Sequence, residues 1–380
     1  MKFIHMADLH IGKSLNGFSM LEDQKYILGE ILEIIDKEKP DGVLLAGDVY
    51  DKKMPPAEAV ALFDDFLYAL SERELMIFII SGNHDSPERL SFGGRIMEKS
   101  RVYISPVYDG KAMAVKMEDE YGPLMVYMLP FIKPSQARAF FPEEDIETYT
   151  DAVRAAVKAM KADPAKRNVL IAHQFVTGAE TFKSEEINVG GLDNVDADVF
   201  KDFDYVALGH VHGPQNIGGD ERIRFCGTPL KYSFSEARHV KSLTEVELKE
   251  KGSLAVRTLP LKPLHDMEEI KGTYGELTYK GYYENTPLQN EYLHITLTDE
   301  EDIPDAMERL RSVYPYLMRL DYDNARTRIM ADEIKGSDGE EKSPEEIFEE
   351  LYILQNNNSF SEEQREILKP IFEKAWEETL

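Results

Sequence analysis

Short apolar runs recur through the first 215 residues, and each of them ends in polar side chains. The runs are KFIHMADLH, DGVLLAGDVYD, LMIFIISGNHD, NVLIAHQFV and DYVALGHVH, which begin at residues 2, 41, 75, 168 and 204. None of them alternates strictly between apolar and polar residues. This pattern predicts five strands that are buried on both faces of a sheet.

Amphipathic segments separate these strands. The segment PPAEAVALFDDFLYALSERE begins with two prolines, which favour the first turn of a helix. Its apolar stripe is predicted to consist of Val60, Phe63, Leu67 and Leu70. The segment YTDAVRAAVKAMKADP predicts a second helix that stops before its proline. The alternation of strands and helices predicts an α/β fold in which helices cover a sheet.

The polar residues that follow the strands are of three types only. They are Asp8, His10, Asp48, Asp51, Asn83, His84, Asp85, His173, His210 and His212. Sites in open α/β sheets gather at the carboxyl ends of strands, and these nitrogen and oxygen donors suit two hard or borderline divalent metals. A single histidine near a strand end is more often a surface or hydrogen-bonded residue. Five strand ends with the same chemistry favour a metal centre.

The ordered motifs D-x-H, G-D-x-x-D, G-N-H-D, an isolated histidine and G-H-x-H resemble the calcineurin-like metallophosphoesterase superfamily. The resemblance covers residues 1 to about 260. It implies a β-sandwich flanked by helices, and not one doubly wound sheet. Two further stretches, HMADLHIGKSLNG and FCGTPLKYSFSEA, are similar to the nuclease subunits of bacterial SbcCD-type complexes.

The resemblance implies a role for each motif residue. The first metal would be held by Asp8, His10, Asp48 and His212, and the second by Asp48, Asn83, His173 and His210. The two divalent ions would be manganese, with magnesium as the alternative. His84 would be catalytic, either stabilising the transition state or protonating the leaving oxygen. Asp51 and Asp85 either orient these groups or are plain turn and capping carboxylates.

The net charge of −27 cautions against a nucleic-acid partner, because phosphate binding usually needs a basic surface. Bound metals or a local basic groove would offset that charge. Lys13, Lys52 and Arg89 lie just beyond motif ends and are candidates for DNA phosphate contacts, as are Lys53 and Arg95. Each of them is equally well interpreted as a solvated surface charge.

The motifs predict a nuclease domain over residues 1–263. Residues 264–333 contain a strand–helix–strand pattern and look like the small α+β domain of the family, which caps the active site and shapes access to DNA; a plain structural extension is the alternative. Residues 334–342 predict a flexible linker. Residues 343–380 predict a helix–loop–helix that either packs back on the body or, as the resemblance implies, docks on the coiled coil of an SbcC-type ATPase subunit. The resemblance also implies a homodimer through helices near residues 56–100.

The function that the resemblance implies, and that is favoured, is a metal-dependent DNA nuclease subunit with double-strand exonuclease and single-strand or hairpin endonuclease activity, in DNA replication, recombination and repair. Two alternatives are a phosphodiesterase or phosphatase for small substrates, and a scaffold for the ATPase subunit. No apolar run is long enough to span a membrane, and His5 and Asp8 interrupt the start of the chain, which is unlike a signal peptide. With Cys226 as the single cysteine, a cytoplasmic, nucleoid-associated protein is expected.

Overall fold

The computed structural model describes residues 1–180 and 194–324, together with a few positions between 327 and 368. The predicted linker and nearly all of the predicted helix–loop–helix lie outside the described residues. The chain divides into two compact units, of which the first comprises Met1–Ile270, Lys280–Ile295 and Met307–Leu320. The second comprises Lys271–Tyr279, Thr296–Ala306 and the described residues from Asp321 onward. Within the described ranges, no helix has the length and apolar character needed to cross a membrane.

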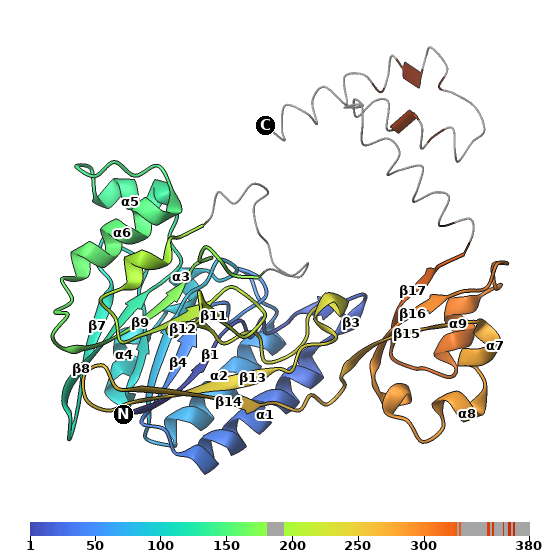
Figure 1. The fold of residues 1–380 in the computed structure, drawn as a ribbon, viewed down its shortest axis with the longest axis horizontal. Coiled ribbons are helices and arrows are strands. Elements are labelled where there is room, and N and C mark those ends of the chain that lie inside the picture. The colour runs from blue at the N-terminus through green and yellow to red at the C-terminus, as the bar shows by residue number, and fades with distance from the viewer. Residues whose placement is uncertain are drawn as a thin grey trace. The chain divides into compact units, whose positions relative to one another are not determined.

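The first unit contains two six-stranded sheets (Figure 1). The first sheet has the order β14-β13-β1-β4-β5-β6, and the second has the order β11-β12-β10-β9-β8-β7. The strands of the first sheet are β1 (Lys2–Met6), β4 (Gly42–Ala46), β5 (Met76–Ile80), β6 (Val102–Ile104), β13 (Ser242–Leu248) and β14 (Leu254–Pro260). Those of the second are β7 (Met113–Asp119), β8 (Gly122–Leu129), β9 (Arg167–His173), β10 (Tyr205–Gly209), β11 (Gln215–Ile217) and β12 (Asp220–Phe225).

The two sheets pack face to face, so the sandwich implied by the resemblance is confirmed and a single doubly wound sheet is excluded. Their inner faces share one apolar core, to which β1 contributes Phe3 and β4 contributes Leu44. The alternate residues of the same strands, such as Ile4 and Val43, belong to a second core on the outer face. Burial on both faces explains why these runs do not alternate between apolar and polar residues.

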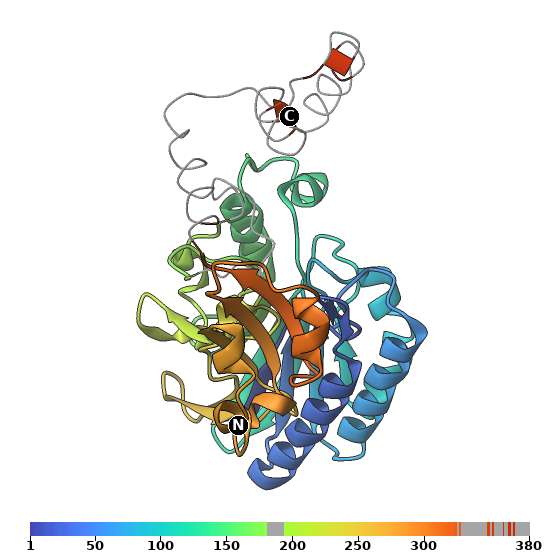
Figure 2. The same cartoon turned by 90° about the vertical axis from the view of Figure 1, so that its right-hand side faces the viewer.

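Helices cover the outer faces of both sheets (Figures 1 and 2). The first sheet packs against α1 (Leu21–Glu38) and α2 (Ala57–Ser71), and the second packs against α6 (Tyr149–Met160). The helix α6 confirms the second predicted helix, and the Thr148 hydroxyl caps it by accepting from the Asp151 N–H. Three short helices lie between α2 and α6 in the sequence: α3 (Pro87–Leu90), α4 (Gly94–Met97) and α5 (Pro134–Phe140).

The stripe predicted for α2 is partly wrong. The residues that α2 buries are Ala59, Phe63, Phe66 and Leu70. Val60 is 45% exposed, so it lies outside the core. Apolar residues on α2 form two overlapping rows, one through Val60 and one through Ala59. The row that packs on the outer face of the sheet is the one through Ala59, which contains both Phe63 and Phe66.

A third sheet, of order β15-β16-β17, follows the sandwich in the chain. Its strands are β15 (Met267–Gly272), β16 (Tyr292–Leu297) and β17 (Leu317–Tyr322). Helices α7 (Tyr274–Leu277), α8 (Lys280–Tyr283) and α9 (Ala306–Arg311) lie between these strands in the sequence. The strand–helix–strand pattern is therefore confirmed, whereas the domain boundaries at 263 and 333 stay predictions. A small hairpin of β2 (Ser14–Leu15) and β3 (Phe18–Ser19) completes the strands of the described ranges.

Candidate metal centre

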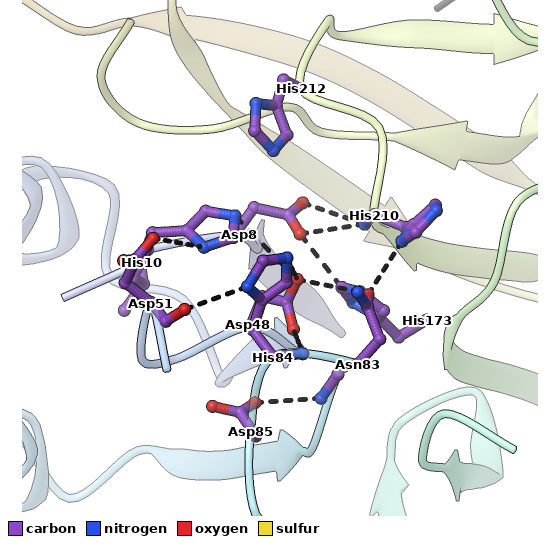
Figure 3. A network of polar contacts seen from close by, with 12 residues as sticks. Asp8, His10, Asp48, Asp51, Asn83, His84, Asp85, His173, His210 and His212 are labelled. Atoms are coloured by element: carbon purple, nitrogen blue, oxygen red, sulfur yellow. Dashed lines mark hydrogen bonds and ion pairs between the residues drawn. The ribbon is translucent and has the colours of Figure 1, made fainter. Parts of the chain in front are cut away.

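The predicted ligands converge at one end of the sandwich (Figure 3). The loops after β1, β4 and β5, which are neighbouring parallel strands, carry Asp8, His10, Asp48 and Asn83. The last residue of β9 and the loop after the parallel strand β10 carry His173, His210 and His212. Because both sheets contribute, the centre depends on the packing of the sandwich and not on either sheet alone.

Four of these ligands have a left-handed backbone that non-glycine residues rarely adopt. The φ angles of Asp8, His10, Asp48 and His210 are 54, 45, 49 and 98°. Such strain persists only where surrounding contacts enforce it, and it concentrates at functional sites. One of these contacts joins the two sheets, since the backbone N–H of His210 donates to both carboxylate oxygens of Asp8 at 2.9 and 3.0 Å.

Asp48 lies at the middle of the cluster and is 2% exposed. Its Oδ2 is 3.3 Å from Nε2 of His173 and 3.9 Å from Nε2 of His10. Ligand atoms from His10, Asp48 and His84, and separately from Asp8, Asp48 and His173, lie within 4.8 Å of one another. A carboxylate common to both groups suits the predicted bridging role, because it has two oxygens to share.

The half of the centre around Asn83 has an arrangement that calls for a cation. Nδ1 of His173 donates to the Ala46 carbonyl at 2.8 Å, so Nε2 is the ring atom that faces the site. That nitrogen lies 3.0 Å from Asn83 Oδ1 as well as close to Asp48. Nδ1 of His210 lies 3.0 Å from the same amide oxygen. In a neutral His173 ring the lone pair of Nε2 would face Oδ1 of Asn83 and Oδ2 of Asp48 and be repelled by both. A bound metal ion would remove that repulsion.

The other half of the centre contains an orphaned histidine. His10 is 1% exposed, and neither of its ring nitrogens has a hydrogen-bond partner among the described residues. Its ring centroid lies 5.2 Å from that of His212 and 4.8 Å from that of His84. Nδ1 of His10 lies 3.8 Å from Oδ1 of Asp51, and Nε2 faces Asp48. Buried polar nitrogens are almost always paired, so Nε2 fits a metal ligand. Both halves of the site therefore fit a divalent metal pair.

The electrostatics of the metal-free centre separate the histidines into two groups. Burial lowers the pKa of His10 well below its ordinary value, and it lowers the pKa of His210 to about 3. Burial would also lower the pKa of His173, but Asp48 and then Asp8 raise it to about 9. Burial would raise the pKa of Asp48, but His173 keeps it well below its usual range. His173 is therefore the ligand that must lose a proton when metal binds.

Asp85 and Asp51 both contact the loops that carry the ligands. The buried Asp85 carboxylate accepts from the backbone N–H groups of Val49, Tyr50 and Gly82 at 3.2, 3.0 and 2.9 Å, and so ties the loop after β4 to the loop after β5. Burial, with the nearby Asp48 charge, raises the pKa of Asp85 to about 6. These contacts favour the orienting role, which stays a prediction.

The Asp51 carboxylate accepts from Nζ of Lys13 at 2.6 Å. The Asp51 carbonyl accepts from Nδ1 of His84 at 2.9 Å (Figure 3). His84 is thereby oriented with Nε2 toward the cluster, 3.9 Å from Oδ2 of Asp48. The His84 side chain is 17% exposed, whereas that of His10 is 2% exposed. Of these two histidines, His84 is the one that remains accessible to a substrate.

The space around residue 82 is too small for any residue other than glycine. A Cβ at this position would lie 2.1 Å from Oδ1 of Asp48, so any side chain would displace the central carboxylate. The φ of Gly82 is not in the left-handed region, so the backbone conformation does not by itself require glycine here.

A cleft of about 810 Å³ adjoins the centre, with Asn83 and His210 among its lining residues. Lys53, Arg89 and Lys133 also line it and supply positive charge. Of the predicted phosphate contacts, Lys53 and Arg89 line the cleft. Lys13 pairs with Asp51, and the exposed Lys52 and Arg95 do not line this cleft.

Several supporting residues were missed by sequence reasoning. Nε2 of Gln24, on α1, donates to the His10 carbonyl at 2.7 Å, and the Tyr232 hydroxyl donates to the Leu9 carbonyl at 2.5 Å. Lys133, in the cleft, was also missed. Neither Gln24 nor Lys133 lies in a motif that carries chemistry. Tyr232 lies in the stretch FCGTPLKYSFSEA, whose only sequence signal is its similarity to the nuclease subunits.

Comparisons with known proteins agree with this geometry. Residues 1–214 match the family model of the calcineurin-like phosphoesterases, and residues 263–356 match that of the type 5 capsule protein repressor C-terminal domain. The chain is 36% identical over 326 residues to the SbcD subunit of the SbcCD nuclease of Staphylococcus epidermidis, covering 84% of this chain and 85% of the relative.

Two solved structures show a weaker likeness. A dimetal phosphatase from Danio rerio has a TM-score of 0.42 at 10% identity, covering 68% of this chain and 96% of the phosphatase. A protein from Thermus thermophilus has a TM-score of 0.40 at 14% identity, covering 68% of this chain and 98% of the other. With the motifs, the sandwich and the two sequence matches taken together, the chain belongs to the calcineurin-like phosphoesterase family and, within it, to the family of the SbcD nuclease subunits of SbcCD complexes.

Proposed function

We propose that this chain is the nuclease subunit of an SbcCD-type complex and hydrolyses DNA phosphodiesters at a centre of two divalent metals. The observation that carries the proposal is the gathering of Asp48 and six further nitrogen and oxygen side chains at one site, beside a cleft that contains basic side chains. The relative from Staphylococcus epidermidis carries the name of such a subunit. Manganese is the proposed ion, with magnesium as the alternative.

Metals at such a centre lower the pKa of a bound water and neutralise phosphate oxygens. The residues of the chain then divide the remaining tasks. Asp8, His10, Asp48 and His212 hold one ion, and Asp48, Asn83, His173 and His210 hold the other. His84 is the proposed catalytic residue, and its orientation by the Asp51 carbonyl leaves Nε2 available to the phosphate or to the leaving oxygen.

The cleft supplies a route for the DNA backbone. Lys53, Arg89 and Lys133 would neutralise phosphates of a bound strand. Asp85 and Glu88 also line the cleft, so its three cations offset the net charge of −27 only locally. Both double-strand exonuclease and single-strand or hairpin endonuclease activity are proposed, and a cytoplasmic, nucleoid-associated location follows from such a substrate.

A homodimer is proposed through α2, α3, α4 and the loops beside them. Large apolar side chains are exposed there, namely Met54, Val60, Tyr68, Phe92 and Ile96. Phe92 is 84% exposed and Ile96 is 75% exposed, which is costly for a monomer in water. The second proposed partner is an SbcC-type ATPase subunit, which would bind the predicted helix–loop–helix over residues 343–380.

The test uses the purified full-length chain with Mn²⁺ or Mg²⁺ and three substrates: labelled hairpin DNA, circular single-stranded DNA and bis(p-nitrophenyl) phosphate. We expect both DNAs to be cleaved. Cleavage of the small diester alone would instead indicate a phosphodiesterase for small substrates. Adding an SbcC-type partner to the full chain, and to a chain that lacks residues 343–380, separates the enzyme from a scaffold.

Two substitutions separate catalysis from metal binding. His84→Asn should reduce DNA cleavage by at least 100-fold and still bind two Mn²⁺ in calorimetry, because its ring is assigned to the substrate. Asp48→Ala should lose both ions together, because this carboxylate would hold both of them. Loss of one ion from His84→Asn would show that His84 is a ligand.

A further inference from the structure

The stretch FCGTPLKYSFSEA, residues 225–237, has a buried carboxylate that the mechanism above does not use. Glu236 ends a short 3₁₀ helix, Phe234–Glu236, and is 0% exposed. Its Oε1 lies 3.3 Å from Nδ1 of His212, and its Oε2 lies 2.5 Å from Nζ of Lys241. A carboxylate is rarely buried to this extent unless its charge is paired.

The contact with Lys241 decides which atom of the His212 ring carries the hydrogen. A carboxylate that contacts a buried ammonium group is ionised, so Glu236 can only accept hydrogen bonds. Nδ1 of His212 must therefore donate to it, which leaves Nε2 without a hydrogen in the neutral ring. Only a ring nitrogen without a hydrogen can bind a metal.

Hydrogen bonds to three buried groups fix the ammonium group of Lys241. Its Nζ donates to Glu236, to the Thr228 hydroxyl at 2.7 Å and to the backbone carbonyl of His212 at 3.0 Å. Lys241 is 4% exposed and Thr228 is 0% exposed. The lysine thus fixes the carboxylate and, at the same time, the main chain of the ligand that the carboxylate contacts.

The ring of His173 is oriented differently. Its Nδ1 donates to a main-chain carbonyl, that of Ala46. His212 instead depends on a charged side chain supplied by a separate segment. In Figure 3 the ring of His212 lies toward Asp8 and His10, which are the other ligands proposed for the first metal.

We propose that Glu236, held by Lys241, is a positioning residue that fixes the tautomer and the ring orientation of His212 and thereby sets the affinity of the first metal. This inference rests on the proposed function, since it takes His212 as a ligand. Carboxylates that orient a ligating histidine in this way typically change metal affinity by about 10–100-fold when they are removed. The second metal, held by Asn83, His173 and His210 with Asp48, should be little affected.

Removing Glu236 alone would leave the ammonium of Lys241 buried without its counter-charge, which could unfold the protein. The informative comparison is therefore between two double variants that both lack the lysine. Glu236→Gln with Lys241→Met keeps an oxygen that accepts from Nδ1 of His212. Glu236→Met with Lys241→Met has similar volume and no acceptor. Both variants are neutral at the pair, so any shared loss of stability cancels from the comparison.

The measurement is calorimetric titration with Mn²⁺, supported by electron paramagnetic resonance, which distinguishes a spin-coupled Mn²⁺ pair from a single ion. We expect the double variant with Glu236→Gln to bind two ions. The double variant with Glu236→Met should bind one of the two ions at least tenfold more weakly and should lose the coupled signal. A smaller difference between the variants, or an equal loss at both sites, would overturn the proposal.

A second measurement needs no substitution. Long-range ¹H–¹⁵N NMR of the metal-free parent reports which ring nitrogen of each histidine is protonated, and His212 should carry its hydrogen on Nδ1. A hydrogen on Nε2 would refute the assignment directly. If the parent neither binds two Mn²⁺ nor cleaves DNA, the proposed nuclease function fails, whereas the tautomer of His212 is still decided by this experiment.

Discussion

Acid should destabilise this fold through a core histidine that takes no part in the metal centre. His5, on β1, is 0% exposed and lies between the two sheets. Its Nε2–H donates to the Leu208 carbonyl at 3.2 Å, so Nδ1 accepts from the Tyr205 hydroxyl at 2.8 Å. Burial, assisted by the charge of Arg224, lowers the pKa of His5 from 6.5 to about 3. The ring is therefore neutral in the folded protein at every pH at which the protein is normally handled.

The sign and the size of the effect follow from linkage between protonation and folding. The pKa of His5 is lower in the folded than in the unfolded chain, so between pH 6.5 and pH 3 only the unfolded chain binds the proton. Stability is complete above pH 6.5 and falls as the pH decreases, by about 1.4 kcal/mol per pH unit. At pH 5 the loss due to His5 is therefore about 2 kcal/mol.

The assay compares the parent with His5→Gln by urea unfolding at pH 7.5 and pH 5.0, in the presence of EDTA. A glutamine amide can donate to Leu208 and accept from Tyr205, but it does not titrate. The other histidines contribute equally to both proteins, so we expect the parent to lose about 2 kcal/mol more than the variant between the two pH values. Equal losses in the two proteins would refute the reasoning.

Further predictions concern the centre and the proposed dimer. Because the pKa of His173 is about 9, Mn²⁺ binding near pH 7.5 should release about one proton, and the affinity for Mn²⁺ should fall about tenfold per pH unit below pH 7.5. The proton release is measured as a dependence of the calorimetric heat on the buffer, and its absence would contradict this prediction. Gly82→Ala should weaken Mn²⁺ binding at least tenfold by displacing Asp48, whereas the control Gly29→Ala, in open space on α1, should bind normally and raise the free energy of unfolding by about 1 kcal/mol. Phe92→Asp should turn a dimer into a monomer in analytical ultracentrifugation; a variant that stays dimeric places the interface elsewhere.

The ligands of the centre could be predicted because they belong to the strands that position them. Each ligand follows or ends an apolar run, and the carboxyl ends of parallel strands necessarily meet along one edge of a sheet. Asp48 and His173 come from different sheets, however, and their approach to 3.3 Å needed the packing of the sandwich. The resemblance to a known family, and not the strand pattern, supplied that packing in advance.

The apolar stripe of α2 could not be fixed in the same way. The rows through Val60 and through Ala59 are both apolar, and a helical pattern alone does not say which row meets a sheet. Val60, which was predicted to be buried, is instead exposed, as are Phe92 and Ile96. Apolar residues that the core leaves out are the ones that support the proposed dimer.

The residues that support the ligands were beyond prediction for another reason. Gln24 lies in a helix, where a glutamine is ordinarily a surface residue, and only the fold brings it to the His10 carbonyl. Tyr232 is 223 positions away from the Leu9 carbonyl that it contacts. Hydrogen bonds of this kind leave no periodic signal, because a single side chain makes them across a long interval of sequence.

These supports explain how the centre can hold a strained backbone. Left-handed conformations cost a non-glycine residue roughly 1 kcal/mol or more, and four ligands adopt them. The groups that hold the strained loops are protein groups: Gln24 and Tyr232 for the loop of His10, and Asp85 for the loop of Asp48. The strain is therefore balanced in part by contacts within the protein. Contacts that order the ligands reduce the entropy that metal binding would otherwise have to offset. It follows that the affinity of the centre depends on these distant supports as well as on the ligands.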